Sequence, residues 1–346
     1  CVTAQHRQML DQVLDIFGIN PDYDLNIMKE GQTLSGITNL VLDGVERVLG
    51  ELKPDMVLVH GDTTTTFAAA LAAFYCKIPV GHVEAGLRTY DKYFPFPEEM
   101  NRKLTGCIAD IHFAPTRSNF NNLVREGVNP ENIYITGNTA IDALRSTVFE
   151  DYEFENELLK NIDFKNKRII AVTAHRRENL GEPLRNICYA LREIKQKYDN
   201  VEIIYPVHLN PLVQEPVREI LEGIPGIHLT EPVQVLDMHN LLARSYLVLT
   251  DSGGLQEEAP SLGKPVLVLR NETERPEAVE AGTVKVVGTD KDNIVKETFR
   301  LLDEETEYKR MAHSVNPYGD GHASERIVEA IRYWFGLTDK KPEPFI

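Results

Sequence analysis

The sequence predicts an α/β protein of two doubly wound domains that face a cleft, and three observations support this prediction. Short apolar runs alternate with helical patterns along the chain, which is typical of parallel sheets with helices on both faces. The 346 residues are more than twice the roughly 150 residues of a common domain. A segment rich in Glu, Asn, Lys and Asp, residues 151–166, interrupts the alternation and has the composition of a surface connection.

The first predicted domain covers residues 1–150. Residues 1–3 have the pattern of a strand that ends there, and residues 5–17 have that of a helix with one apolar face. Because the chain begins within this strand pattern, we expect that an opening strand and helix are missing. A helix is also expected at residues 64–75, and further strands are expected at residues 56–60, 79–83, 111–113 and 133–135.

The second predicted domain covers residues 167–322, where the alternation of strands and helices resumes. A last helix at residues 323–335 is expected to pack back on the first domain, so residues 323–346 are assigned to that domain. The strands of the second domain are expected at residues 168–173, 201–205, 246–250 and 265–269. In such folds, ligands bind beyond the carboxyl ends of the strands.

Composition excludes several classes of protein. The chain has 37 Lys and Arg against 53 Asp and Glu, a net charge of −16, which disfavours binding to nucleic acid or to an anionic membrane. The most apolar stretch, residues 67–76, is too short to span a bilayer. The four cysteines are far apart in sequence and form no Cys-x-x-Cys pair, which fits a reducing cytoplasm.

One candidate binding segment follows the strand at residues 246–250. Ser252, Gly253 and Gly254 could bring backbone N–H groups and a hydroxyl to a phosphate at the start of a helix. A plain strand-to-helix turn capped by Ser252 is the alternative. Glu258, on the first turns of that helix, could accept hydrogen bonds from ribose hydroxyls, or could simply favour the helix dipole.

Two further segments of this domain place basic residues just after strands. Arg176 and Arg177 enter a helix, which is unfavourable unless an anion binds there, and we favour a phosphate or effector contact over a solvated turn. His208 also lies just past a strand, although a lone histidine is a weak signal. The histidines show neither H-x-x-x-H nor H-E-x-x-H spacing, and we expect no metal and no cofactor.

In the first domain, carboxylates stand at strand ends or at a helix start. Asp62 and Glu84 follow strands, and Glu98 comes directly after Pro97 in the first turn of a helix. Acids gathered in a partly desolvated site can have their pKa values separated, which suits acid/base catalysis. Ordinary surface or helix-terminal charge is the alternative, and it is the one we prefer for Glu99, which diverges from Glu98 by about 100° on a helix.

Several segments together resemble the non-hydrolysing UDP-N-acetylglucosamine 2-epimerases of bacteria. They are spread in family order over almost the whole chain, so the resemblance is specific. The segments are residues 60–66 (His-Gly-Asp-Thr-Thr-Thr-Thr), 82–89 (His-Val-Glu-Ala-Gly-Leu-Arg-Thr), 97–102 (Pro-Glu-Glu-Met-Asn-Arg), 174–179 (Ala-His-Arg-Arg-Glu-Asn), 206–211 (Pro-Val-His-Leu-Asn-Pro), 250–260 (Thr-Asp-Ser-Gly-Gly-Leu-Gln-Glu-Glu-Ala-Pro), 273–277 (Thr-Glu-Arg-Pro-Glu) and 316–321 (Asn-Pro-Tyr-Gly-Asp-Gly).

The resemblance implies two Rossmann-like domains of the glycosyltransferase-B type in a cytoplasmic homodimer, with a UDP-sugar as substrate. The implied reaction interconverts UDP-N-acetylglucosamine and UDP-N-acetylmannosamine by elimination of UDP and re-addition through a 2-acetamidoglucal, for cell-envelope polysaccharide synthesis. The family's catalytic positions fall on Asp62, Glu84, Glu98 and His208. Its UDP-binding positions fall on Ser252, Gly253 and Gly254 for the diphosphate, Glu258 for the ribose, Arg275 near the phosphates and Met238 against the uracil.

The sequence departs from the family pattern in two places. The sequence does not contain the Gly-Thr-Arg-Pro-Glu loop that begins family members, and we expect that a segment of about 30 residues is missing, the size of one βα unit with its loops. Some members are activated by a second substrate molecule. Gln5, Gln8, Gln32 and Arg176 match that effector site, but Gly31 stands where its arginine would be.

Two other functions remain open. A two-domain UDP-sugar glycosyltransferase would share the phosphate turn but would need an acceptor and no acids around C2 of the sugar. A catalytically impaired protein that only binds UDP-sugars would bind tightly without exchanging the C2 proton. Incubation with UDP-N-acetylglucosamine in deuterated water, without an acceptor, separates the three.

Overall fold

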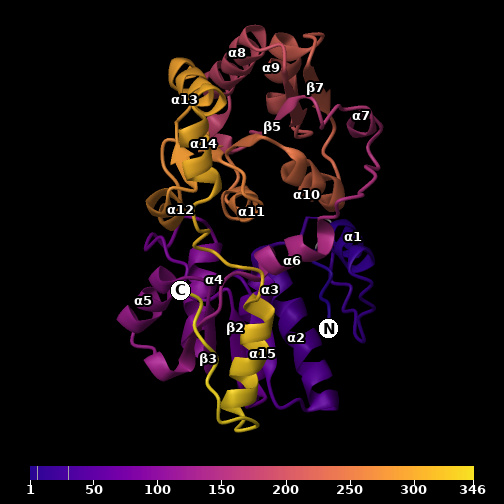
Figure 1. Ribbon diagram of the computed structural model, residues 1–346. Coiled ribbons are helices and arrows are strands. Elements are labelled where there is room, and N and C mark those ends of the chain that lie inside the picture. Colours follow the sequence, from indigo (N-terminus) through magenta and orange to yellow (C-terminus); the bar gives the residue numbers. More distant parts are fainter. Residues whose placement is uncertain (6, 30) are drawn as a thin grey trace. The chain divides into compact units, whose positions relative to one another are not determined.

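The computed structural model describes residues 1–5, 7–29 and 31–346, without the side chains of Gln8 and Met9 (Figure 1). The chain forms two compact units: unit 1 comprises Cys1–Thr139 and Gly321–Ile346, and unit 2 comprises Ala140–Asp320. The first boundary therefore falls before the segment 151–166 that the sequence analysis favoured. The reason is local, because Phe149 N–H donates to Oδ1 of Asn240 at 3.0 Å and Tyr152 Oη donates to Asp237 at 2.8 Å.

Unit 1 contains a parallel sheet with the strand order β1-β2-β3-β4. Its strands are β1 (Val57–His60), β2 (Val80–Val83), β3 (Ile111–Ala114) and β4 (Ile133–Ile135). Its helices are α1 (Arg7–Ile16), α2 (Leu34–Leu52), α3 (Thr64–Tyr75), α4 (Glu98–Ile108), α5 (Arg117–Arg125) and α15 (Ala323–Trp334), with a 3₁₀ turn at Pro130–Asn132; α6 (Thr139–Thr147) begins at its boundary with unit 2.

The helices of unit 1 follow from their apolar spacing. In α2, Ile37, Val41 and Val45 recur every four residues and are buried in one cluster with the alanines of α3. Thr33 caps α2 by accepting from Gly36 N–H at 3.1 Å. At the other end of the chain, Ile327 and Ala330 of α15 pack in a cluster with residues of β3 and β4, so the last helix belongs to unit 1 (Figure 1).

Unit 2 contains a larger parallel sheet with the strand order β10-β9-β8-β5-β6-β7. Its strands are β5 (Arg168–Thr173), β6 (Val201–Pro206), β7 (Ile227–Thr230), β8 (Leu247–Thr250), β9 (Val266–Val268) and β10 (Val284–Val286). Its helices are α7 (Glu157–Lys160), α8 (Glu182–Lys197), α9 (Pro211–Leu221), α10 (Val235–Arg244), α11 (Leu255–Ser261), α12 (Pro276–Ala281), α13 (Lys291–Asp303) and α14 (Glu305–Ala312), with a 3₁₀ turn at Arg177–Asn179.

Both faces of this sheet are buried. Along β5, Ile170 and Val172 lie in one apolar cluster, whereas Ile169 and Ala171 lie in another. Because successive side chains of a strand point to opposite faces, the two clusters occupy the two sides of the sheet. This arrangement confirms the prediction of a doubly wound α/β fold.

The strand order of unit 2 fixes where a ligand can bind. Chain order reverses between β5 and β8, which are hydrogen-bonded neighbours. In open α/β sheets this topological switch point opens a crevice beyond the carboxyl ends of the two strands. The segments that follow β5 and β8 are those that carry Arg176 and Ser252. Among the described residues, no helix is long and apolar enough to cross a membrane.

Candidate active site

In unit 2, Asp251 joins the segments that follow β5 and β8. Its carboxylate is fully buried, and Oδ2 accepts from the backbone N–H groups of His175 at 2.7 Å and Arg176 at 2.8 Å. The Asn179 side-chain amide donates to the same oxygen at 3.0 Å. A buried charge with three donors fixes both segments at the switch point.

Two guanidinium groups converge over the turn that follows Asp251. A Cβ atom at Gly253 would lie 3.6 Å from Nη2 of Arg275 and 3.7 Å from Nη2 of Arg176. Arg275 is held by a hydrogen bond from its Nε to Glu257. Burial lowers the pKa of Arg275, but the nearby Glu257, Tyr318 and Glu274 together raise it above its ordinary value, so the charge is retained. The turn is therefore an electropositive, glycine-lined surface suited to a phosphate.

The buried side chain of Gln256 fixes this turn. Its amide donates to the Ser252 carbonyl at 3.0 Å, and its carbonyl accepts from Thr273 Oγ1 at 2.5 Å. Thr273 Oγ1 in turn accepts from Arg275 N–H at 3.0 Å, and Thr250 Oγ1 accepts from Ser252 N–H at 2.9 Å. The turn and the arginine beside it are thus preorganised before any ligand arrives.

Glu258 lies on α11, one helical turn after Gly254, in a desolvated position. Burial, with a contribution from the Glu257 charge, raises the pKa of Glu258 to about 7. Met238, from α10, packs on the apolar cluster that also includes Leu255 of α11.

The His208 ring stacks on the His175 ring, with centroids 5.4 Å apart and planes 10° from parallel. His208 Nδ1 accepts from Asn210 N–H at 3.0 Å.

In unit 1, Asp62 and Glu84 follow the neighbouring strands β1 and β2, and Glu98 opens α4. Asp62 Oδ2 accepts from Nη2 of Arg102 at 2.6 Å, and its backbone carbonyl accepts from the Asn101 amide at 3.0 Å. Burial raises the pKa of Asp62, Arg102 opposes that rise, and the charges of Glu84 and Glu98 add to it. The charges of Glu84 and Glu98 therefore both act on the Asp62 carboxyl.

Glu84 is held in a constrained backbone position. Its φ is +62°, in the left-handed region that non-glycine residues rarely adopt, and such positions are concentrated at functional sites. Oε2 of Glu84 lies 3.2 Å from Nε2 of His60, and this hydrogen bond raises the pKa of His60. His82, which is fully buried, lies with Nε2 2.8 Å from the Gly61 carbonyl and anchors the segment between His60 and Asp62.

The interpretation of Glu99 as ordinary surface or helix-terminal charge is wrong, because its side chain is buried and holds a loop. Its two carboxylate oxygens accept from the backbone N–H groups of Thr89 and Tyr90, each at 3.0 Å. Arg102 approaches the same carboxylate at 3.4 Å. Glu99 therefore holds the loop after β2, whereas Glu98 is partly exposed.

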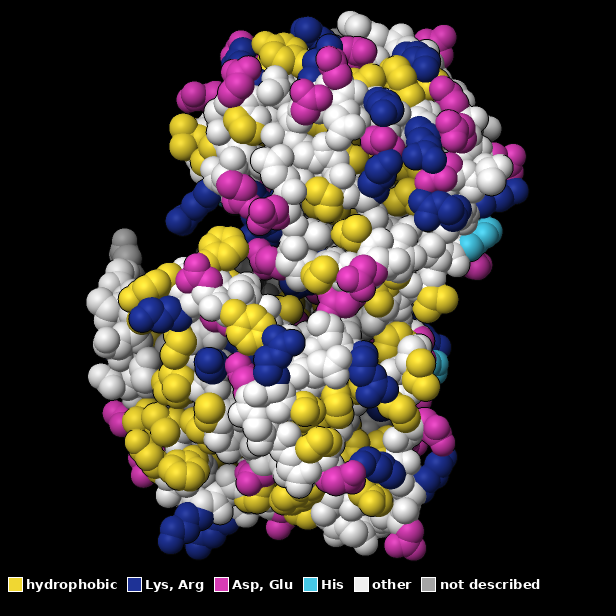
Figure 2. All heavy atoms as spheres, turned by 90° about the vertical axis from the view of Figure 1, so that its left-hand side faces the viewer, with side chains coloured by type: hydrophobic (Ala, Val, Ile, Leu, Met, Phe, Trp, Pro, Cys, Tyr) yellow, Lys and Arg dark blue, Asp and Glu magenta, His cyan; other side chains and the backbone are white. Residues whose placement is uncertain are grey.

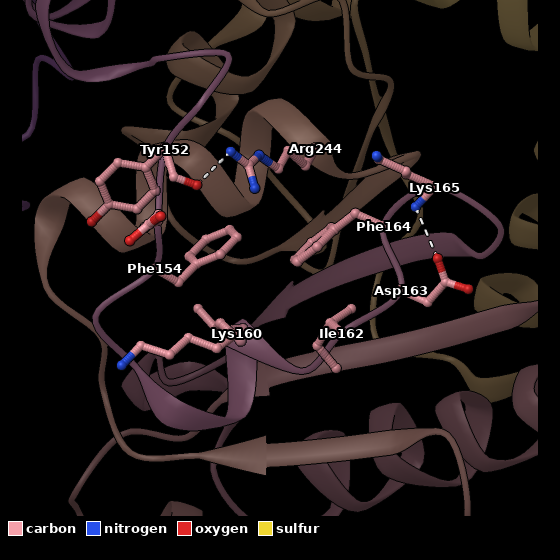
Figure 3. Close-up of a pocket in the computed structure, with 10 residues that line it drawn as sticks. Tyr152, Phe154, Lys160, Ile162, Asp163, Phe164, Lys165 and Arg244 are labelled. Atoms are coloured by element: carbon pink, nitrogen blue, oxygen red, sulfur yellow. Dashed lines mark hydrogen bonds between the residues drawn. The ribbon is translucent and has the colours of Figure 1, made fainter.

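A cavity of about 450 Å³ lies elsewhere in unit 2, and none of the predicted site residues lines it (Figure 3). Arg244 stacks over Phe154 and Phe164, at 5.0 and 5.9 Å from their centroids, and donates to the Tyr152 carbonyl at 2.7 Å. Asp163 accepts from the backbone N–H groups of Lys165 and Asn166. These contacts fix the segment 152–165.

Comparison with known proteins agrees with this geometry. The family model described as UDP-N-acetylglucosamine 2-epimerase matches residues 1–332. The UDP-N-acetylglucosamine 2-epimerase of Bacillus subtilis is 56% identical over 99% of this chain and 90% of that protein. The chain belongs to the UDP-N-acetylglucosamine 2-epimerase family. This confirms the resemblance inferred from the sequence.

Solved structures of the family have the same fold. The Neisseria meningitidis UDP-GlcNAc 2-epimerase bound to UDP-GlcNAc has a TM-score of 0.86 at 50% identity, covering 96% of this chain and 91% of that one. The S. aureus MnaA–UDP structure has a TM-score of 0.88 at 51% identity, covering 97% and 89%. The glycosyltransferase-B-like class predicted from the sequence is therefore confirmed.

The residues predicted for an effector site have several local contacts. Gln5 Oε1 accepts from Thr65 Oγ1 at 2.6 Å, and the Gln32 amide donates to the Ile27 carbonyl at 2.7 Å. The Gln8 side chain lies outside the described residues. Arg176 belongs to unit 2, where its guanidinium lies beside Gly253.

Sequence reasoning assigned no role to Arg102 or Asp251. Arg102 is four residues after Glu98, so helical spacing already places both on one face of α4, and that spacing could have identified it. Asp251 directly follows a fully buried strand, and a buried carboxylate requires hydrogen-bond partners. Among the described residues, no group of three or more His, Cys, Asp or Glu side chains is placed to hold a metal ion.

Proposed function

We propose that this protein interconverts UDP-N-acetylglucosamine and UDP-N-acetylmannosamine by epimerisation at C2 of the sugar. The observation that carries the proposal is the presence of three carboxylates, Asp62, Glu84 and Glu98, at strand ends and a helix start of unit 1. The other unit of the same chain has a glycine-lined turn suited to a phosphate. A protein that only binds nucleotides has no need of three electrostatically coupled acids.

The proposed reaction has two steps. A carboxylate removes the proton from C2, the C–H electrons form the C1–C2 double bond, and the C1–O bond breaks so that UDP leaves as an anion. The intermediate is a 2-acetamidoglucal. UDP then adds back to C1 while C2 is protonated from the opposite face. Electrons move only within the sugar and its leaving group, so the overall reaction is an isomerisation.

The unit 1 residues suit the proton transfers. The proposed catalytic groups are Asp62, Glu84 and Glu98. Desolvation raises the pKa of Asp62, which favours its protonated form, while Arg102 keeps the carboxyl oriented. The contact of Oε2 of Glu84 with Nε2 of His60 at 3.2 Å orients its carboxylate.

The unit 2 residues suit the nucleotide. Arg176 and Arg275 would neutralise the diphosphate at Ser252, Gly253 and Gly254, most strongly when UDP departs with its full charge. Glu258 would accept from the ribose hydroxyls, and Met238 would pack against the uracil. His208 would assist near the sugar, with its ring held by the stack on His175.

The experiment that tests the proposal is incubation with UDP-N-acetylglucosamine in deuterated water without an acceptor, followed by NMR. Deuterium at C2 together with UDP-N-acetylmannosamine supports epimerisation. Sugar transfer that occurs only when an acceptor is added would support the glycosyltransferase alternative. Tight binding with no exchange at C2 would support a protein that only binds the UDP-sugar.

We further propose a homodimer. On the face drawn in Figure 2, hydrophobic side chains gather on unit 1. Large apolar side chains of unit 1 are exposed, among them Phe74 and Tyr75 at the end of α3 and Tyr93 and Phe96 before α4. Exposed apolar side chains in such number favour an interface. Sedimentation equilibrium should give the dimer mass, and a monomer at micromolar concentration would contradict the proposal.

The remaining proposals concern setting and regulation. The cysteines Cys1, Cys76, Cys107 and Cys188 are all unpaired, which supports a reducing cytoplasm, and cell fractionation tests it. The product of the reaction is proposed to be used in envelope polysaccharide synthesis. Deletion of the gene should therefore alter the cell-surface polymer. Gln5, Gln8, Gln32 and Arg176 are the positions of a possible effector site, in which Gly31 replaces the family's arginine. A sigmoidal rate curve would support activation by substrate, and a hyperbolic curve would contradict it.

A further inference from the structure

His60 pairs with Glu84 across two neighbouring strands of unit 1. Nε2 of His60 lies 3.2 Å from Oε2 of Glu84. His60 ends β1, and Glu84 directly follows β2. The two side chains are 59% and 30% exposed, so the pair lies open to solvent at the carboxyl edge of the sheet, where a ligand can reach both groups.

The backbone at Glu84 leaves the strand geometry where this contact forms. His60 is the register partner of Val83 in the parallel pair of β1 and β2, so the two side chains point to the same face of the sheet. In a continued strand the next residue, Glu84, would point to the opposite face. The φ of +62° at Glu84 ends the strand, and its side chain instead meets that of His60.

Gly61 leaves room for the Glu84 carboxylate. A Cβ atom at Gly61 would lie 3.4 Å from Oε2 of Glu84, the same oxygen that contacts His60. His82 holds this backbone, because its Nε2 lies 2.8 Å from the Gly61 carbonyl, which can only accept a hydrogen bond. The Glu84 carboxylate is therefore placed by the His60 ring on one side and by a fixed glycine on the other.

Stability alone does not explain this arrangement. Ion pairs that are open to solvent contribute little to the free energy of unfolding. A left-handed φ at a non-glycine residue is unfavourable in itself. A strained backbone that supports an exposed pair of ionisable side chains is therefore typical of a functional position, where the orientation of the groups matters more than the stability they provide.

The charges around the His60 ring favour its protonated form. The hydrogen bond with Glu84 raises the pKa of His60, burial opposes that rise, and the charges of Glu84 and Asp62 add to it. Helix α3 contacts β1 through Thr66, which donates to the His60 carbonyl at 2.5 Å, and α3 contains no charged residue. Among the described residues, the charged groups that act on the ring are thus two carboxylates.

We propose that His60 is a positioning residue for Glu84, whose carboxylate it holds at the sheet edge in the orientation that exchanges the C2 proton of the sugar. The inference rests on the proposed function, in which Glu84 is one of the acids that act at C2. An imidazolium makes a charge-assisted hydrogen bond to the carboxylate, and a neutral imidazole makes a weaker one. Turnover should therefore fall as the pH rises through the raised pKa of His60.

The first measurement is the titration of the His60 ring by NMR in the protein without ligand. The spectrum of His60→Gln identifies its signal. In Glu84→Gln a neutral amide replaces the carboxylate, so the pKa of His60 should fall. This measurement tests the pair without relying on activity.

The second measurement compares turnover of UDP-N-acetylglucosamine in two variants of His60. His60→Ala removes the donor to Glu84, and turnover should fall about 10- to 100-fold, the effect of one hydrogen bond to a charged group. His60→Gln keeps an amide donor that does not titrate, so it should restore part of the turnover and lose the fall at higher pH that the His60 ring causes. The affinity for UDP, which in the proposed function binds unit 2, should stay unchanged in both variants.

His228→Gln is the matched control. His228 pairs with Glu202 at 2.9 Å in unit 2, so the same substitution removes a histidine–glutamate pair away from the three carboxylates of unit 1. Turnover and its pH dependence should stay unchanged. Thermal melts verify that each variant is folded.

The outcomes separate the inference from the proposed function. Low turnover in His60→Ala, partial recovery with an altered pH profile in His60→Gln and unchanged UDP affinity support the inference. Equal losses in the two variants with the original pH profile, or no loss in either, would overturn the role of His60. A His60 titration that Glu84→Gln leaves unmoved would overturn the pairing and leave the proposed function intact. No epimerisation by the unaltered protein, with the pairing seen by NMR, would overturn the proposed function itself.

Discussion

Gly253→Ala is the most informative single substitution at the nucleotide turn. The added Cβ would meet Nη2 of Arg275 at 3.6 Å, Nη2 of Arg176 at 3.7 Å and Cζ of Arg275 at 3.8 Å, which are ordinary van der Waals distances. Gly253 is not among the residues with positive φ, so alanine fits its backbone. We therefore expect the variant to fold with unchanged thermal stability.

The expected loss is in nucleotide affinity. A phosphate oxygen that bonds both arginines lies about 2.8 Å from each donor nitrogen, and the new methyl group would lie in this same space. Displacing the phosphate from one donor costs at least one charge-assisted hydrogen bond, about 1.5 kcal/mol or more. The affinity for UDP should then fall by about 10-fold or more.

Isothermal titration with UDP measures this loss, and a thermal melt verifies the fold. Gly50→Ala is the matched control, because Gly50 lies in α2 of unit 1 and a Cβ there meets no atom within 4 Å. The control should keep its affinity and gain about 0.5–1 kcal/mol of stability. Unchanged UDP affinity in folded Gly253→Ala would show that the turn is only a helix cap and that the nucleotide binds elsewhere.

Three other predictions follow from the described contacts. Glu84→Gln or Glu98→Gln should lower turnover by at least about 100-fold with little loss of UDP affinity, and wild-type turnover in both would refute their role. Burial lowers the pKa of His82 and His112 to about 4. Between pH 6.5 and 4 the unfolded chain therefore binds more protons than the folded protein. As the pH is lowered through this range, the free energy of unfolding should fall by up to about 1.4 kcal/mol per pH unit for each histidine. Melting curves should show a shallower fall in His82→Gln, and an equal slope would refute this. Activity should persist in the presence of a chelator and without added nicotinamide. Activity that a chelator abolishes and zinc restores would contradict this prediction.

The sequence predicted many strands and helices of the fold well. The segments expected at 64–75, 133–135 and 168–173 coincide with α3, β4 and β5, because each is a continuous apolar or helical pattern. Strands β7 and β10 were not predicted. Both are edge strands of their sheet, and His228 and Lys285 interrupt their short apolar runs. A polar residue within a run of only three or four residues leaves a hydrophobic signal too weak to predict a strand.

The sequence shows which residue types follow the strands but not the contacts that they make. Position after a strand and the glycine pair pointed to Asp62, Glu84 and the turn at Gly253, whose roles stay predictions. The approach of Arg176 to Gly253 joins segments 77 residues apart, and it depends on the pairing of β5 with β8. Sequence spacing cannot supply such a contact, since the strand order that creates it is set by packing of the whole sheet.

The central claim is that this protein moves the proton at C2 of a UDP-sugar. The direct measurement is NMR of UDP-N-acetylglucosamine incubated with the protein in deuterated water. We predict deuterium at C2 of both UDP-N-acetylglucosamine and UDP-N-acetylmannosamine as they approach equilibrium, and no incorporation with Glu84→Gln. Interconversion without deuterium at C2, or no interconversion by folded protein that binds UDP, would contradict the account.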